Sequence, residues 1–385
     1  MNAGASLKHA PSRILAWALP YWTRGKPGRE TPAELFWVLY SGWIAAFVLK
    51  VLGSSWDVSW HFKWLRDDLA PPHLINSVGT AIAVALTIIH GYTGYGVDKI
   101  ALRLIQWGTG IFLVAVPLDL INHRINGLDI TSWSPSHMML YFGTGVMIAG
   151  VVRGWYVGAP PGRGRDLMLG ALFLFSFEDM LFPNQHQEYG VLSVAAWDRG
   201  TPYAEPILLQ FAADQLGRPV DRGMAVQFSL PMPEWLYPVY AVAACLIVLV
   251  IARRMVGRTW TATAIAAVFV AYRCVIWPLL TYTDFPPSAV PFFLVVGGLC
   301  VDLVFLARLP YAARALAGAV VVTAGAYGAL YVQGEVLAAP PFGFGSAPVA
   351  AALLAVLWLG AEVLMRRLGG EPQVSEARVS VIATP

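Results

Sequence analysis

The chain has 385 residues, of which 57% are hydrophobic and only 13% charged, and its mean hydropathy is +0.59. Soluble globular domains carry about 25% charged residues, so this composition excludes an ordinary soluble domain and predicts an integral membrane protein. The net charge of +3 is small. Because the basic residues lie mainly between apolar segments, the charge indicates membrane topology and gives no sign of nucleic-acid binding.

Ten apolar segments approach the length of about 20 residues that a helix needs to cross a bilayer. We expect an all-α, polytopic transmembrane helical bundle with spans near residues 33–52, 73–93, 101–121, 136–152, 167–183, 235–252, 260–280, 290–308, 315–332 and 347–365. Lys and Arg gather in alternate connections, which predicts cytoplasmic N- and C-termini. The segments after the first and third spans then face the extracytoplasmic side of a bacterial inner membrane.

The chain is expected to have five parts. They are a cytoplasmic N-terminal tail (1–32), a half that carries the motif described below (33–155), a fifth helix with a long outer loop (156–234), a C-terminal helical scaffold (235–366) and a cytoplasmic tail (367–385). Cys245, Cys274 and Cys300 lie inside apolar segments without paired spacing. Neither a disulfide framework nor a zinc knuckle is therefore expected.

One motif, Asp-x3-His followed by a later His, occurs twice in the first four spans. Its members are Asp57, His61 and His73 in the first copy, and Asp119, His123 and His137 in the second. A carboxylate and an imidazole at positions i and i+4 lie on one face of a helix, and the second imidazole arrives at the start of the next helix. We therefore expect two metal sites, carried by an internal repeat of helix pairs one–two and three–four.

The two copies agree beyond the ligands. Asp67 and Asp129 each lie ten residues after the leading Asp, and Gly79 and Gly143 each lie six residues after the last His. An isolated membrane histidine more often packs or hydrogen-bonds than binds a metal, but the repeat favours metal binding. The two later aspartates fit either partners that orient an imidazole or helix caps. His90 stands alone and is expected to be structural.

Two imidazoles and one carboxylate suit non-haem iron, zinc and copper, and they leave coordination positions open. The residue types therefore predict a catalytic metal without naming it.

Further ionisable residues lie in or near the fifth and seventh spans. Glu178 and Asp179 with Arg273 are expected to form an intramembrane ion pair rather than a proton path. His186, together with Glu188, is a candidate for an added ligand or a proton relay at the outer mouth of the fifth helix. The loop that follows is a candidate cap over the metal sites.

The first copy also resembles a known family. Asp57-Val58-Ser59-Trp60-His61, Arg66-Asp67 and Pro72-His73 are similar to the Asp-x-x-Trp-His, Arg-Asp and Pro-Ser-His pattern in the third membrane subunit of particulate methane monooxygenase and ammonia monooxygenase. In these copper membrane monooxygenases that pattern supplies a copper site. The second copy, with Pro135-Ser136-His137, resembles the neighbouring copper site of the family.

The resemblance covers about residues 50–150 and has departures. The first His-to-His interval is one residue shorter than in the family, and Asp119 stands where the family has Asn. The family enzyme has three subunits and a soluble copper-binding domain, and nothing in this chain resembles a cupredoxin.

The resemblance implies that copper, rather than iron or zinc, is bound by the six motif residues, and that these residues are catalytic. The implied reaction is O2 activation and hydroxylation of a small apolar substrate, such as a hydrocarbon or ammonia. The implied partners are the lipid bilayer, an external electron donor and other membrane subunits or further copies of this chain. Two other functions stay open: a copper-binding carrier or importer, and a non-catalytic subunit of a membrane complex.

Overall fold

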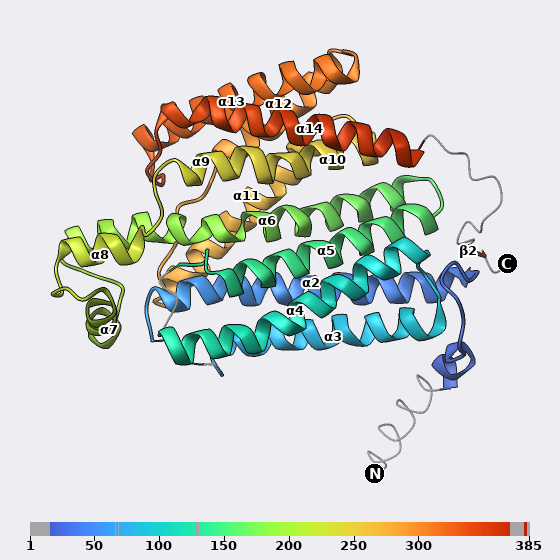
Figure 1. Cartoon of the computed structure of the whole chain (residues 1–385), viewed down its shortest axis with the longest axis horizontal. Coiled ribbons are helices and arrows are strands. Elements are labelled where there is room, and N and C mark those ends of the chain that lie inside the picture. The colour runs from blue at the N-terminus through green and yellow to red at the C-terminus, as the bar shows by residue number, and fades with distance from the viewer. Residues whose placement is uncertain (1–15, 66, 68, 128–130, 370–380, 383–385) are drawn as a thin grey trace, which may run out of the picture.

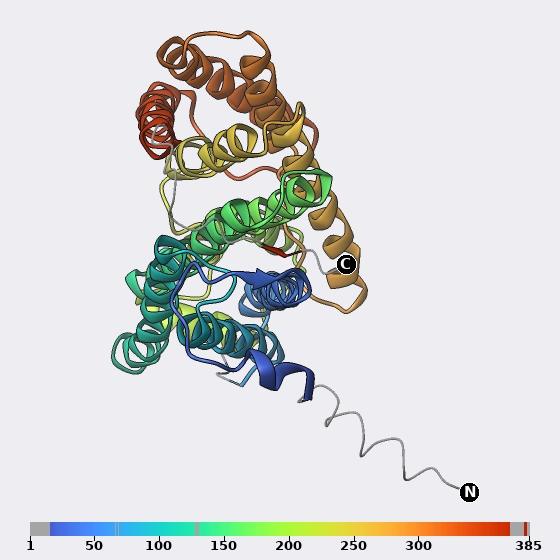
Figure 2. The same ribbon diagram turned by 90° about the vertical axis from the view of Figure 1, so that its right-hand side faces the viewer.

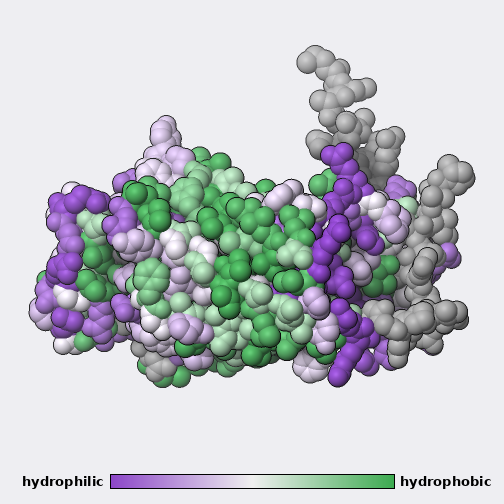
Figure 3. All heavy atoms as spheres, turned by 90° about the horizontal axis from the view of Figure 1, so that it is seen from above, coloured by the Kyte–Doolittle hydropathy of each residue, from purple (hydrophilic) through white to green (hydrophobic). Residues whose placement is uncertain are grey.

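The structure, a computed structural model, describes residues 16–65, 67, 69–127, 131–369 and 381–382. These residues form an all-α bundle in which most helices run along one axis (Figure 1). Within this part of the chain, eight helices are long and apolar enough to cross a membrane. The surface shows an apolar band between more hydrophilic ends (Figure 3). The chain is therefore a membrane-embedded helical protein.

The eight helices coincide with eight of the expected spans. They are α2 (Ala33–His61), α3 (Pro71–Thr93), α4 (Lys99–Asn126), α5 (Pro135–Gly158), the run of α9 (Leu236–Tyr240), the π-helical η2 (Ala241–Cys245) and α10 (Leu246–Val256), α11 (Thr261–Tyr282), α13 (Tyr311–Val336), and η3 (Phe344–Ser346) continued by α14 (Ala347–Gly369). Both α2 and α4 extend past the expected ends of their spans, so the Asp-x3-His pairs lie on the same helices that cross the bundle.

The expected spans at 167–183 and 290–308 differ from the structure. The second is only the 14-residue α12 (Phe293–Leu306), which is shorter than a straight bilayer crossing requires. The first lies inside α6 (Arg163–Asp198), a 36-residue helix that continues past Pro183. A proline removes one helical hydrogen bond, and polar residues follow it, so the sequence predicted an end here.

Tertiary partners explain why α6 continues. The side chain of Asn184 donates a hydrogen bond to the carbonyl of Tyr237 in α9 at 2.9 Å. Within α6 itself, Gln185 donates to Glu178, two turns earlier, at 3.1 Å. The expected outer loop over 184–234 is correspondingly helical for much of its length. It consists of the end of α6 followed by α7 (Pro206–Leu216) and α8 (Arg222–Ser229).

The two ends of the bundle differ. Helix α2 begins and α14 ends at one end, whereas α7 and α8 lie at the other (Figure 1). Besides the short η1 (Leu19–Tyr21), the parallel strands β1 (Thr31–Pro32) and β2 (Val381–Ile382) pair at the first end. The start of α2 and the end of α14 therefore lie at the same end of the bundle.

Helices α2 and α3, and likewise α4 and α5, form two closely packed hairpins. The glycines that recur in the motif explain this packing. A Cβ at Gly79 would lie 2.7 Å from the carbonyl oxygen of Ala46, and one at Gly143 would lie 2.7 Å from the amide nitrogen of Phe112. Glycine therefore allows backbone contact within each hairpin. Helix α6 runs between these hairpins and the C-terminal helices (Figure 2).

Candidate metal centres

The first centre joins α2 to α3. Asp57 and His61 lie in the last turns of α2, and His73 is the third residue of α3. His73 Nε2 lies 2.8 Å and His61 Nε2 lies 3.4 Å from the same carboxylate oxygen, Asp57 Oδ1. Pro71 and Pro72 occupy the first helical positions of α3, where their missing N–H groups cost no helical bond. The new helix thereby begins beside the end of α2 and presents His73 to it.

The second centre joins α4 to α5 in the same way. Asp119 and His123 lie near the end of α4, and His137 is the third residue of α5. The Nδ1 atom of His123 lies 3.4 Å from Asp119 Oδ2, and the Nε2 atom of His137 lies 3.4 Å from Asp119 Oδ1. The structure therefore brings together both expected sets of three residues.

Two serines organise the second centre. Ser134 caps α5, since its hydroxyl accepts a hydrogen bond from the amide of His137 at 3.4 Å. Ser136 donates a hydrogen bond to Asp119 Oδ1 at 2.8 Å and so fixes the orientation of the carboxylate. The sequence repeat aligned Ser136 with Pro72 but did not reveal this bond.

Both centres have donor spacing that suits a transition-metal ion. In each, one carboxylate oxygen and two imidazole nitrogens lie within 4.8 Å of one another. Donors bound at about 2.0–2.2 Å with tetrahedral or octahedral angles are roughly 3–3.5 Å apart, close to the 2.8–3.4 Å between carboxylate and imidazole atoms. Three protein donors leave positions open for an exogenous ligand. Copper, iron and zinc all fit these donors.

The centres differ in burial. The side chains of Asp57 and His61 are 26% and 33% exposed, whereas those of Asp119 and His123 are 8% and 7% exposed. The later histidines, His73 and His137, are both 22% exposed, so the first centre is the more open one at its Asp and leading His.

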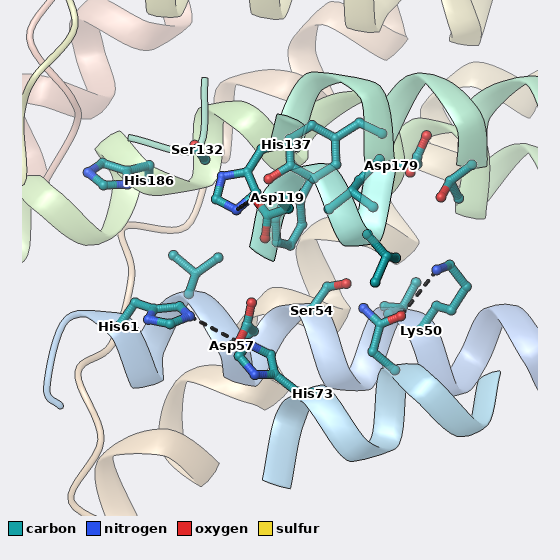
Figure 4. A pocket seen from close by; sticks show the side chains of 18 of the residues that line it. Lys50, Ser54, Asp57, His61, His73, Asp119, Ser132, His137, Asp179 and His186 are labelled. Carbon is teal, nitrogen blue, oxygen red and sulfur yellow. Dashed lines mark hydrogen bonds and ion pairs between the residues drawn. The ribbon is translucent and has the colours of Figure 1, made fainter. Parts of the chain in front are cut away.

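Both centres border one cavity of about 570 Å³ (Figure 4). This volume is in the range of small-molecule sites. Apolar side chains such as Val58, Leu120 and Leu140 form much of its wall. Phe211 of α7 and Phe228 of α8 also line it, so the segment expected to cap the site contributes to the cavity wall.

Lys50 is a cavity residue that the motif analysis missed. It is 7% exposed, its ammonium donates to Asn76 Oδ1 at 3.1 Å, and it lies 3.9 Å from the centroid of the Phe112 ring. Lys50 precedes Asp57 by seven residues on α2, and therefore lies two turns away on nearly the same face. An ionisable side chain within an apolar span was the available signal.

The expected ion pair of Arg273 with Glu178 or Asp179 was wrong. Arg273 Nη2 instead lies 2.8 Å from Glu188 Oε2 and donates to Ser288 at 2.6 Å. The spacing of residues along two helices does not specify their relative shift, which decides the partner. Asp302 of α12 pairs with Arg253 of α10 at 2.9 Å.

His186 lines the cavity, but it belongs to neither group of three donors. Its Nε2 atom lies 3.4 Å from the carbonyl oxygen of Phe228. Burial lowers the pKa of this imidazole to about 4, so it is neutral near pH 7. Glu188, which was expected to act together with His186, instead forms an ion pair with Arg273. It also accepts a hydrogen bond from the hydroxyl of Tyr237 at 3.0 Å.

Two further expectations concern residues outside the centres. His90 is fully buried, accepts a hydrogen bond from Trp43 at 3.0 Å and contacts the carbonyl of Tyr95 at 2.8 Å, as expected for a structural histidine. Asp67 accepts from the amide of Leu69 at 2.9 Å, which places it in the turn before α3. Its counterpart Asp129, and Arg66 of the family pattern, lie outside the described residues.

Comparisons with protein-family models, with curated proteins and with solved structures found no match to this chain.

Proposed function

We propose that this chain is a copper-dependent membrane monooxygenase, or the metal-bearing subunit of one, that hydroxylates a small apolar substrate. The proposal is carried by one observation: two groups of one carboxylate and two imidazoles open onto a single, largely apolar cavity. Bound copper would supply the redox chemistry that activates O2. Copper itself is chosen from the motif resemblance, since the donor set alone suits several metals.

The protein's own residues would prepare the site for this reaction. Asp57 and Asp119 each lie beside two imidazoles and would bind the metal with them, and the hydrogen bond from Ser136 orients one of these carboxylates. The apolar wall would hold the substrate and limit water near the reacting atoms. The overall reaction converts R–H, O2, two electrons and two protons into R–OH and water. A reduced electron-transfer protein or a comparable external donor would supply the electrons.

We also propose an orientation of the chain in the membrane. By the distribution of basic residues, the end with α7, α8 and both centres would face the extracytoplasmic side of a bacterial inner membrane. Other membrane subunits or a second copy of the chain would complete the enzyme.

A copper carrier or importer is the competing function. The more exposed first centre suits metal capture. However, transport requires ligands that continue across the membrane, and both groups of three donors within the described residues border the same cavity. The monooxygenase is therefore favoured.

Metal analysis and oxygen consumption test the proposal together. Purified wild-type protein should bind copper, Asp57→Ala and Asp119→Ala should each lose part of it, and the double variant should lose nearly all. Asp214→Ala, which removes an exposed carboxylate on α7, is the matched control. Full copper content in the double variant would show that neither centre binds the copper.

The enzymatic part requires membranes that contain the protein, a reductant and a panel of hydrocarbons and ammonia. Substrate-dependent O2 consumption should appear in wild type and Asp214→Ala and disappear in the double variant. Copper binding without any such consumption would favour the carrier or the non-catalytic subunit.

A further inference from the structure

Three buried charged side chains line the cavity beside the metal centres. Lys50 of α2 is 7% exposed, and Glu178 and Asp179 of α6 are 5% and 8% exposed. Figure 4 shows Lys50 and Asp179 on opposite sides of the cavity. None of the three belongs to the two donor groups, so the centres do not account for their presence.

Asp179 has an oxygen without a protein partner. Its Oδ2 atom is buried and makes no hydrogen bond within the described structure. A Cβ at Gly145 of α5 would lie 3.2 Å from this oxygen, so the absence of a side chain there leaves room beside the carboxyl group. Glu178, in contrast, accepts a hydrogen bond from Gln185 at 3.1 Å. Burying an ionised carboxylate without a partner is costly.

The local charges do not balance if both carboxyl groups are ionised. Lys50 is the cation that faces them across the cavity, while Arg273 of α11 is engaged by Glu188. Among the described residues, the hydroxyls of Tyr141 on α5 and Tyr240 on α9 also interact with Asp179. One ammonium group neutralises one of two neighbouring carboxylates, and a proton on the other removes the excess buried charge.

We propose that Asp179 holds this proton and donates it into the cavity, as a proton source for the reduction of O2. This role rests on the proposed function, because monooxygenation consumes two protons for each O2. When the carboxyl O–H of Asp179 releases its proton, the resulting carboxylate faces the ammonium group of Lys50, which stabilises it. Solvent then returns a proton to the same oxygen. A purely structural ion pair would instead keep both carboxylates ionised.

Infrared spectroscopy tests the protonation without relying on activity. Wild-type protein at pH 7 should show the C=O stretching band of a protonated carboxyl group. That band should persist in the spectrum of Glu178→Gln and be missing from the spectrum of Asp179→Asn. An unchanged band in Asp179→Asn, or no such band in wild type, would overturn the assignment.

Turnover tests the delivery of the proton. Asp179→Asn should keep its full copper content but lose substrate-dependent O2 consumption by about a hundredfold or more, the scale of general acid catalysis. The wild-type rate should fall at alkaline pH as Asp179 loses its proton, and this fall should be absent from the remaining activity of Asp179→Asn. Asp214→Asn on α7 should match wild type.

The two levels of the proposal fail in different ways. If the infrared band is assigned to Asp179 but wild type consumes no O2 with any substrate, the monooxygenase function fails and the protonated carboxyl group stands. If wild type is active and Asp179→Asn retains its rate and pH profile, the proton-donating role is wrong and the monooxygenase stands.

Discussion

The residue before the second histidine differs between the centres: it is Pro72 in the first and Ser136 in the second. Proline favours the start of α3 but has no hydroxyl to offer. Ser136 also lies in the first turn of its helix and in addition donates to Asp119. The two centres therefore share their donors but differ in how the carboxylate is held.

Removing the Ser136 hydroxyl should weaken the second centre alone. Outer partners of metal ligands typically change metal affinity by about 10–100-fold, so Ser136→Ala should lower copper affinity by about tenfold. The measurement is a copper titration in an Asp57→Ala background, where only the second centre remains. Ser77→Ala, which alters an exposed cavity residue of α3, is the control. Equal affinity in the Ser136→Ala and Ser77→Ala proteins would contradict this role.

Because its Asp and leading His are less buried, the first centre should release metal faster than the second. Its Asp and leading His are 26% and 33% exposed, against 8% and 7% in the second centre, so a chelator reaches it more readily. Asp119→Ala, which retains the first centre, should therefore lose copper to a chelator faster than Asp57→Ala does. Timed chelation followed by elemental analysis measures both rates. The reverse order would show that exposure does not control release.

The sequence predicted which Asp and leading His lie together in each candidate centre, because i and i+4 positions on a helix are fixed by local geometry. It did not predict the partner of Arg273, which is Glu188 rather than Glu178, because that contact depends on how far α6 and α11 shift along each other. Lys50 was missed for a related reason. The role of Lys50 depends on α6, which places Asp179 across the cavity from it.

At the scale of elements, the hairpins could be predicted and α6 could not. Proline at the start of α3 and α5 and the repeated glycines are local signals. The continuation of α6 through Pro183 depends on distant partners, such as the carbonyl of Tyr237 that accepts from Asn184. Local sequence patterns do not indicate partners that lie so far away in the chain.

Filling the contact between α4 and α5 should damage the second hairpin. In Gly143→Val the new side chain would overlap the backbone of Phe112, and overpacking of this kind typically costs about 1–3 kcal/mol. We expect a lower thermal midpoint and loss of copper from the second centre. Gly110→Val on α4 is the matched control, because a Cβ there meets no atom within 4 Å apart from the neighbouring backbone of its own helix. Thermal unfolding and copper content of both variants test this, and equal behaviour would refute the contact's importance.

For the whole molecule, the helical membrane bundle follows from composition and apolar lengths. The orientation in the membrane remains a prediction from basic residues. It can be tested with single cysteines in a background in which Cys245, Cys274 and Cys300 are replaced.

A membrane-impermeant maleimide should label Asp214→Cys on α7 in intact spheroplasts. It should label Arg163→Cys, at the start of α6, only after permeabilisation. Both positions are exposed, so the difference reports the side of the membrane and not burial. The opposite pattern would place both candidate centres on the cytoplasmic side.

The glycine contacts within the hairpins also separate two properties of the molecule. Each centre is carried by one stiff hairpin, so a displacement of one hairpin relative to the other leaves the donor geometry of both centres intact. The spacing between the centres instead depends on contacts between the hairpins, such as that of Lys50 with the Phe112 ring. It also depends on α6, where Tyr189 donates to the carbonyl of Ser55 at 3.0 Å and Pro183 accepts from Ser132 at 2.8 Å. Substitutions within a hairpin should therefore alter the donor geometry of one candidate centre, whereas substitutions between the hairpins or along α6 should alter the separation of the two centres.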